Sequence, residues 1–111
     1  MNGARYQIKP GTGGKIHFVL IAENNEPIGT GKSVKTRAEV DDLIKEIQIC
    51  SQSVENFEKM ISANEQPVFR LWNADQLTLL LKSELYSSPA MRDNGIDSVM
   101  ANGATIKIEE R

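Results

Sequence analysis

The sequence predicts an α+β fold in which two tandem β-β-β-α(-β) repeats form one antiparallel sheet with two helices packed on one face. Apolar residues recur at a fixed separation, because Phe69-x-Leu71 lies 51 positions after Phe18-x-Leu20. Within each half, apolar residues first recur at every second position, as in strands, and then at every third or fourth position, as in helices. We therefore expect a single domain over residues 1–111, made of two repeats at about 4–54 and 55–109.

The match between the two halves depends on apolar spacing more than on identity. Tyr6 corresponds to Phe57 at the separation of 51, whereas Val34 corresponds to Tyr86 at a separation of 52. The extra residue of the second half must therefore lie between positions 75 and 83, where a turn or a β-bulge can absorb it.

Each repeat is expected to begin with three short strands separated by turns. Residues 10–14 of the first copy are rich in glycine, which tolerates positive φ. Tight turns are expected at residues 23–25 and 74–76. The predicted strands are Arg5–Lys9, Lys15–Ala22 and Pro27–Thr30 in the first copy, and Asn56–Met60, Val68–Asn73 and Leu77–Lys82 in the second.

A helix should follow the third strand of each copy. Thr36 and Ser88 occupy N-cap positions, where a side-chain oxygen accepts a hydrogen bond from a free backbone N–H. Glu39 completes a capping box with Thr36, and Pro89 suits the first helical position, which needs no N–H donor. Gly103 is expected to end the second helix in a left-handed conformation.

A final strand is expected after each helix. In the second copy, residues 105–109 alternate Ile106 and Ile108 with charged residues, which is typical of a strand with one buried face. In the first copy, the counterpart is predicted at Ser53-Val54.

The two faces of the predicted sheet differ in composition, because side chains alternate along a strand. The positions expected to face the helices are Phe18, Leu20, Ala22, Phe69 and Leu71. The opposite face would carry Val19, Ile21, Arg70 and Trp72, with His17 at its end. Tryptophan and arginine are enriched at the energetic centres of interfaces, so Val19, Ile21, Arg70 and Trp72 are predicted to form a partner surface.

Composition excludes several classes of protein. The formal net charge of −2 gives no general attraction to phosphate backbones or anionic lipid, so strong nonspecific binding to nucleic acid is not expected. No apolar stretch is long enough to cross a bilayer, and the first residues lack the apolar region of a secretory signal, so we expect a cytoplasmic protein. Cys50 is the single cysteine, which excludes an internal disulfide and suggests a buried, inert thiol.

The segment Ser83–Val99 resembles the signature of the YegP-like proteins, a bacterial and archaeal family of unknown function. The resemblance lies in Ser83-Glu84-x-Tyr86-Ser87-Ser88 and in Asn94-Gly95-Ile96-x-Ser98-Val99. It implies tandem repeats that form one continuous sheet and exchange their last strands. It implies no catalytic, metal-binding or cofactor residues. The chain departs from the family pattern at Asn25, Val34 and Leu77–Leu81.

Motifs that suggest catalysis or nucleotide binding are incomplete. Gly31-Lys32-Ser33 resembles the end of a phosphate-binding loop, but Glu26 occupies the position of the first glycine, so we interpret the segment as a strand-to-helix turn. His17 is the single histidine and has no partners for a triad or a zinc site. We therefore expect no enzyme activity, no cofactor and no metal.

The favoured function is a small non-catalytic interaction module that binds a protein partner, or itself, through the sheet face or an edge. An alternative is weak binding of single-stranded nucleic acid, with Trp72 and Tyr6 stacking on bases. An uncharacterised small-molecule enzyme is a third hypothesis. A small-anion site at the start of the second helix is a further candidate, formed by Tyr86, Ser87, Ser88 and Arg92.

Overall fold

A computed structural model, which describes residues 3–110, contains seven strands and two α-helices in that range. The first half contains β1 (Arg5–Pro10), β2 (Ile16–Ile21), β3 (Pro27–Thr30) and α1 (Arg37–Cys50). The second half contains β4 (Phe57–Ile61), β5 (Pro67–Trp72), β6 (Leu79–Ser83), α2 (Pro89–Asn102) and β7 (Ile108–Glu110). Two 3₁₀ turns lie at Thr12–Gly14 and Val54–Asn56.

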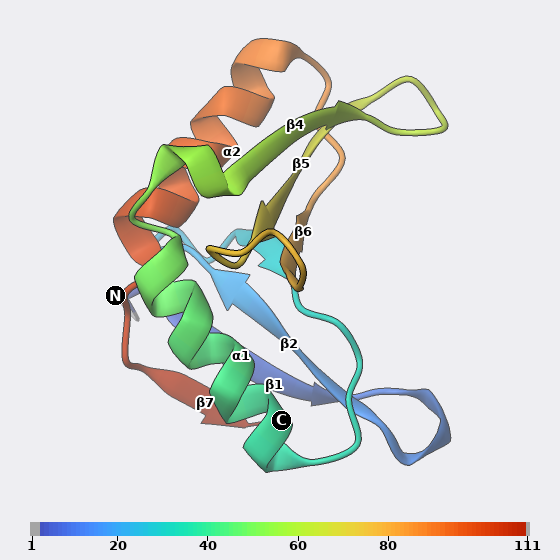
Figure 1. Cartoon of the computed structure of the whole chain (residues 1–111), viewed down its shortest axis with the longest axis vertical. Coiled ribbons are helices and arrows are strands. Elements are labelled where there is room, and N and C mark those ends of the chain that lie inside the picture. The colour runs from blue at the N-terminus through green and yellow to red at the C-terminus, as the bar shows by residue number, and fades with distance from the viewer. Residues whose placement is uncertain (1–2, 111) are drawn as a thin grey trace.

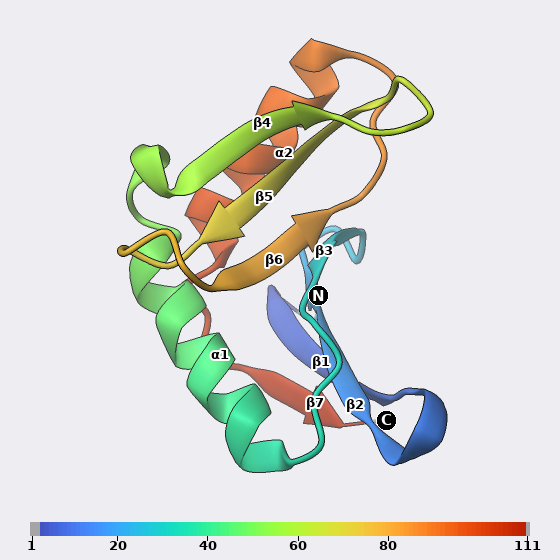
Figure 2. The same ribbon diagram turned by 45° about the vertical axis from the view of Figure 1, so that its right-hand side comes forward.

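All seven strands form one sheet in the order β4-β5-β6-β3-β2-β1-β7 (Figures 1 and 2). Neighbouring strands are antiparallel except β7, which pairs parallel to β1. The prediction of an α+β fold is confirmed, but the sheet is mixed and not antiparallel throughout. No hairpin joins β7 to β1, so turn geometry does not impose an antiparallel direction on this pair.

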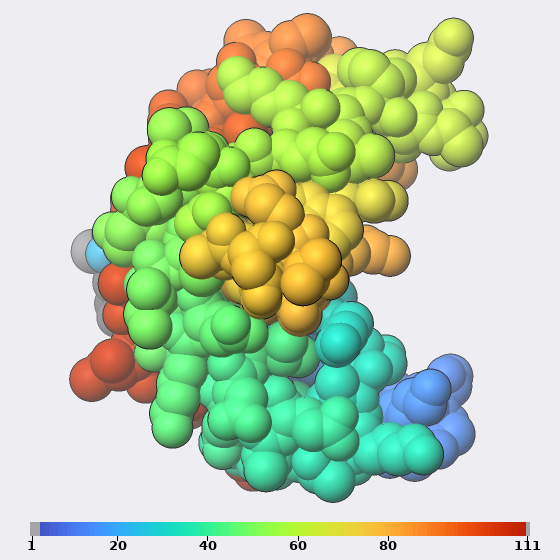
Figure 3. Space-filling model, in the orientation of Figure 1, coloured from blue at the N-terminus to red at the C-terminus, as the bar shows by residue number. Residues whose placement is uncertain are grey.

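Helix-facing side chains of the sheet form one core with the inner stripes of α1 and α2. The five side chains predicted to face the helices are buried. Both helices lie on the left in Figure 1, and the β1–β2 and β4–β5 hairpins project to the right. In the space-filling view of Figure 3, the surface is hollowed between these two hairpins. The helix residues in this core are Val40, Leu43, Ile44, Ile47 and Cys50 of α1 and Ile96 and Val99 of α2.

The strands are arranged similarly on the two sides of the β3–β6 junction. The Tyr6 and Phe18 rings meet edge to face at 5.9 Å, and the Phe57 and Phe69 rings meet edge to face at 5.7 Å. The register shifts once between β2 and β3 and once between β5 and β6, at corresponding positions. Because both halves contain this bulge, the extra residue of the second half lies in the longer turn between β5 and β6.

Both helices begin at the predicted caps. Thr36 Oγ1 accepts a hydrogen bond from the Glu39 backbone N–H at 3.2 Å. Ser88 Oγ accepts one from the Met91 backbone N–H at 3.1 Å, with Pro89 in the first turn of α2. Each cap satisfies a backbone donor that has no partner within the helix.

The predicted left-handed conformation of Gly103 is wrong, because its φ of −64° and ψ of −23° are right-handed helical values. Glycine is needed there for space. A Cβ on this residue would lie 2.5 Å from Ser51 Oγ. The Tyr6 hydroxyl also donates to the Gly103 carbonyl oxygen at 2.6 Å, which ties β1 to the end of α2.

The two predicted final strands have different outcomes. β7 begins at Ile108, later than expected, because the Thr105 hydroxyl donates to the Ala4 carbonyl oxygen at 2.8 Å and holds the preceding turn. The strand predicted at Ser53-Val54 is wrong. The chain turns there, since the Asn56 N–H donates to Ser53 O at 3.1 Å and its side-chain amide donates to Cys50 O at 3.0 Å.

Replacing Tyr6 by phenylalanine should lower the free energy of unfolding by about 1–2 kcal/mol at neutral pH, because the buried Gly103 carbonyl would lose its donor. Burial also raises the pKa of the Tyr6 phenol above its usual 10.0. The folded chain therefore holds this proton more tightly than the unfolded chain, and stability should fall as the pH rises above about 10. Urea unfolding at neutral and alkaline pH measures both effects.

Tyr86→Phe is the matched control. Its hydroxyl forms no hydrogen bond with the described part of the chain, and its ring is half-buried. The control should cost less stability at neutral pH than Tyr6→Phe. Equal losses for the two variants would contradict the role assigned to the Tyr6 hydroxyl.

Candidate functional site

The outer face of the sheet, which points away from the helices, carries the strongest candidate site. Arg70 and Trp72 of β5 are half-exposed on this face. The Trp72 Nε1–H donates to Glu58 Oε1 of β4 at 3.0 Å. A partly exposed tryptophan that is oriented by a hydrogen bond offers a rigid apolar surface to a partner.

Arg70 belongs to a row of directly opposed residues that crosses the sheet. Its neighbours in the row are Glu58 on β4 and Lys82 on β6. Beyond Lys82 the row continues through Thr30, Val19 and Gln7. The row is therefore charged where it crosses β4, β5 and β6 and uncharged where it crosses β3, β2 and β1. We name Glu58, Arg70, Trp72 and Lys82 the Trp72 patch.

The Trp72 patch contains two opposed like charges. Arg70 and Lys82 face each other on neighbouring strands, and like charges in this arrangement destabilise a sheet. Neither side chain forms an ion pair with any of residues 3–110. The Glu58 carboxylate accepts from the indole and lies on one side of Arg70 only. A negatively charged group from outside the chain would relieve this repulsion.

The structure does not unite all four residues of the predicted partner surface. Val19 and Ile21 are only 8% and 7% exposed, so they offer little area to a partner. They lie on β2, which is three strands from β5 in the sheet, or about 14 Å at the usual strand spacing. His17 is half-exposed further along β2. The surface available to a partner is therefore centred on β5.

The predicted anion-site residues at the start of α2 are engaged in separate contacts. Ser88 Oγ caps the helix, and Arg92 Nε donates to Asp93 Oδ1 at 3.3 Å. The Tyr86 ring stacks on Phe69 at 6.2 Å, and burial together with nearby Glu84 raises the pKa of its phenol. Ser87 is exposed. Capping accounts for the position of Ser88 and packing for that of Tyr86, so neither position by itself indicates an anion site.

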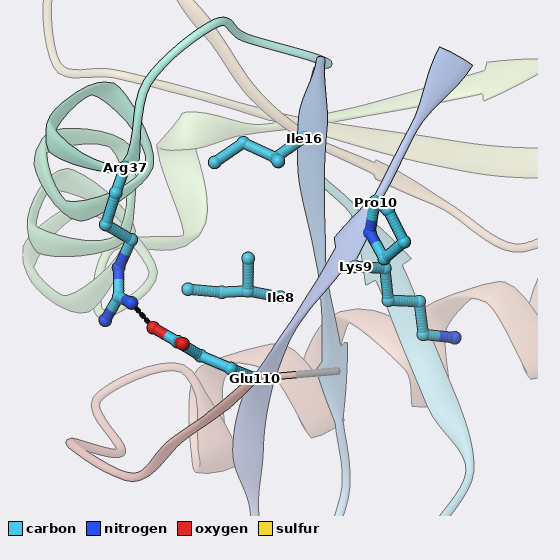
Figure 4. A pocket seen from close by; sticks show the side chains of 6 residues that line it. All are labelled: Ile8, Lys9, Pro10, Ile16, Arg37 and Glu110. Carbon is cyan, nitrogen blue, oxygen red and sulfur yellow. Dashed lines mark ion pairs between the residues drawn. The ribbon is translucent and has the colours of Figure 1, made fainter. Parts of the chain in front are cut away.

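Several shallow hollows mark the surface, with volumes of about 200 to 310 Å³. The hollow in Figure 4 has Ile8 and Ile16 among its lining residues, and the ion pair between Arg37 of α1 and Glu110 of β7 lies beside it. Arg37 Nε also pairs with Asp41 Oδ1 at 2.9 Å. Small-molecule sites usually enclose about 300–1,000 Å³, so these hollows lie at or below the lower end of that range.

The segment that resembles a phosphate loop is packed against the core. Gly31 N donates to Phe18 O at 2.9 Å, and the Phe18 ring fills the space beside the Gly31 Cα. Its neighbours Lys32 and Ser33 are exposed and line a hollow with Thr30 and Leu79–Lys82. The segment is a strand-to-helix turn, as the sequence indicates.

Comparison with known proteins identifies relatives over nearly the whole chain. A UPF0339 protein of Acinetobacter baylyi is 32% identical over 95% of this chain and 94% of its own length. A UPF0339 protein of Mannheimia succiniciproducens is 34% identical over 95% of this chain and 92% of its own length. The chain belongs to the UPF0339, or YegP-like, family. Residues 62–110 also match the family model "Domain of unknown function (DUF1508)".

Solved structures of UPF0339 proteins have the same fold. The solution NMR structure of the Shewanella oneidensis protein superposes with a TM-score of 0.88 at 33% identity, covering 99% of this chain and 92% of that one. The NMR structure of Escherichia coli YegP gives a TM-score of 0.91 at 24% identity, covering 100% of this chain and 95% of that one. The latter is described as a protein of unknown function, and the family has no established activity.

In this UPF0339 protein, the described residues show neither a metal-binding cluster nor a membrane-spanning helix. Residues 3–110 contain no group of three or more histidine, cysteine, aspartate or glutamate side chains placed to hold a metal ion. None of the helices in that range is long and apolar enough to span a bilayer. Cys50 is buried at the end of α1.

Sequence reasoning missed Glu58 and Lys82 as members of the Trp72 patch. The run Leu79-Leu80-Leu81-Lys82 does not alternate, because Leu80 lies in a bulge and points into the core. The separation of 52 between the two halves could have identified Lys82. It pairs Lys82 with Thr30, the last residue of the third predicted strand of the first half.

Proposed function

We propose that this chain is a small non-catalytic interaction module that binds a protein partner through the Trp72 patch. The observation that carries the proposal is the half-exposed Trp72 beside Arg70 and Lys82, which form no ion pair with residues 3–110. Residues at the corresponding positions of the first half, Ile21, Val19 and Thr30, are buried or uncharged. The second half therefore carries the partner surface.

The chemistry of the patch favours an acidic partner segment with an apolar side chain. Trp72 would supply apolar contact area, and arginine binds carboxylates through two parallel hydrogen bonds. A carboxylate placed between Arg70 and Lys82 would replace their repulsion with two attractions. Because the patch is solvent-exposed, binding should weaken as the salt concentration rises.

Single-stranded nucleic acid is a less favoured ligand. The prediction required Trp72 and Tyr6 to stack on bases, but Tyr6 is fully buried in the core and cannot reach a base. The aromatic ring that remains available for stacking on a base is that of Trp72, which lies beside the cations of Arg70 and Lys82. The single tryptophan of the chain provides a direct test, because stacking of an oligonucleotide on Trp72 would quench its fluorescence.

Replacing Trp72 by serine should weaken capture of a protein partner by about 30-fold, as expected for the loss of a tryptophan anchor worth about 2 kcal/mol. Affinity chromatography with the immobilised chain, followed by titration of the captured protein, measures the change. Leu77→Ser is the control, because Leu77 is an apolar residue outside the patch and, at 81%, is more exposed than Trp72. The control should leave capture unchanged.

Self-association is tested by light scattering with the same three proteins. A dimer that dissociates only in the Trp72→Ser variant would assign the patch to contact between copies. A monomer in every case, together with equal capture by wild type and Trp72→Ser, would overturn the proposal.

We also infer that the two halves, about residues 4–54 and 55–109, arose by tandem duplication. Three features support this inference: the corresponding edge-to-face aromatic pairs, the corresponding bulges, and the strand order that runs outward from β3 and from β6 in the same sequence. β7 lies beside β1 of the other half, which agrees with the strand exchange implied by the family resemblance.

A further inference from the structure

The two edges of the sheet are covered differently. At one edge, β7 lies against β1, with Ile108 opposite Tyr6 and the Tyr6 N–H donating to Lys107 O at 2.9 Å. At the other edge, β4 pairs with β5 alone, and no other strand among residues 3–110 lies beside it. The chain between α1 and β4 turns at Val54–Asn56 and runs straight into β4, so it leaves this edge uncovered.

The backbone of β4 has free hydrogen-bonding positions on its outer side. The Phe57 N–H donates to Val54 O and therefore points away from β5. Because N–H groups alternate in direction along a strand, those of Lys59 and Ile61 point the same way. No hydrogen bond to residues 3–110 uses these two donors. An open edge of this kind can accept an extended segment from another protein.

The side chains between this edge and α2 form an exposed ion pair. On the covered edge, Ile108 packs against the core next to α1. On the open edge, Lys59 Nζ of β4 forms an ion pair with Asp93 Oδ1 of α2 at 3.2 Å. The two side chains are 54% and 47% exposed, so the pair contributes little and is easily displaced. Hydrogen bonding to Lys59 lowers the pKa of the Asp93 carboxyl.

We propose that the outer edge of β4 accepts an extended segment of a partner protein as an additional strand parallel to β4. An apolar side chain of that segment would pack beside α2 as Ile108 packs beside α1. The occupant resembles β7 in chemistry, with apolar residues at alternate positions. The inference rests on the proposed function only in requiring a protein partner, since it uses the edge of the sheet and not the Trp72 patch.

A second copy of this chain fits the edge less well than a different protein. If two β4 strands paired antiparallel over their whole length, Lys59 would lie opposite Lys59 of the other copy. Like charges directly opposite each other destabilise a strand pair. This repulsion disfavours an edge-to-edge dimer and leaves the position to a partner segment.

The test uses a synthetic peptide with the sequence of residues 104–110, Ala-Thr-Ile-Lys-Ile-Glu-Glu, as the probe. Titration into the isotope-labelled chain should shift the amide signals of Lys59 and Ile61 and slow their hydrogen exchange. The amides of Tyr6 and Ile8 should not change, because their N–H groups point toward β7, which already covers them. A spin label at the N-terminus of the peptide should broaden signals near Phe57, and a label at its C-terminus should broaden signals near Ile61.

Lys59→Pro and Lys59→Ala separate the backbone contribution from the side-chain contribution. Proline removes an outward N–H that no strand uses, which an edge strand tolerates. It should weaken peptide binding about tenfold, the equivalent of one lost hydrogen bond of about 1.4 kcal/mol, while alanine should not weaken it. The spin-label result needs no variant, so it decides the question even if Lys59→Pro does not fold.

The outcomes also distinguish this inference from the proposed function. Trp72→Ser should bind the peptide as wild type does, since Trp72 lies on β5. Absence of saturable binding, changes confined to Tyr6 and Ile8, or a spin-label pattern that indicates an antiparallel peptide would each overturn the inference. None of these results would affect partner capture by the Trp72 patch.

Discussion

Replacing Phe69 by alanine should destabilise the folded chain by about 3–5 kcal/mol, as is usual for removal of a fully buried phenylalanine. The ring lies between two others, edge to face with Phe57 and stacked with Tyr86. The space left cannot be filled by collapse of α2, because Gly95 offers no side chain on that side. Domains of this size have a total stability of about 5–15 kcal/mol, so the loss is a large fraction of the whole.

Chemical denaturation followed by the fluorescence of the single tryptophan measures this loss. Leu77→Ala is the control, because Leu77 is 81% exposed and its removal should change the free energy of unfolding by less than about 0.5 kcal/mol. A Phe69→Ala variant as stable as the control would show that the second half does not depend on this aromatic cluster.

Local patterns predicted most of the fold because the interactions that decide them are local. The caps at Thr36 and Ser88 act within one helical turn, and the buried face of Phe18 and Leu20 follows from the alternation of side chains. The absence of a strand at residues 53–54 results from hydrogen bonds that Asn56 donates to Ser53 and Cys50, which the apolar pattern does not indicate. The direction of β7 depends on contacts between distant segments. The hydrogen bond from Thr105 to Ala4 is one of these, and no periodicity in the sequence indicates it.

The candidate site was predicted in part for the same reason. Alternation along β5 placed Arg70 and Trp72 on the outer face correctly. It could not show that Val19 and Ile21 are buried, because their exposure depends on their neighbours in the sheet and not on their own strand. The sequence pattern also did not predict the open edge at β4. It indicated a final strand of the first half at Ser53-Val54, where the structure has a turn.

Replacing Gly31 by alanine should destabilise the chain by about 2–3 kcal/mol through overpacking. A Cβ at this position would lie 2.2 Å from Cε1 and Cζ of the Phe18 ring, which is itself fully buried. The ring also contacts Tyr6 and cannot move outward without disturbing that pair. Lys32→Ala, the next residue and an exposed one, is the control and should have almost no effect on stability.

A double-mutant cycle with Phe18→Leu identifies the cause of this loss. Leucine is shorter than phenylalanine, so Gly31→Ala should cost less in the Phe18→Leu background, with a coupling energy of about 1 kcal/mol or more. If Gly31 were needed to bind phosphate, the effects of Gly31→Ala and Phe18→Leu on the free energy of unfolding would simply add. Added nucleotide would then stabilise the wild-type chain but not the Gly31→Ala variant. The packing explanation requires coupling and predicts that nucleotide does not change the midpoint of unfolding, because the Phe18 ring already fills the space beside Gly31.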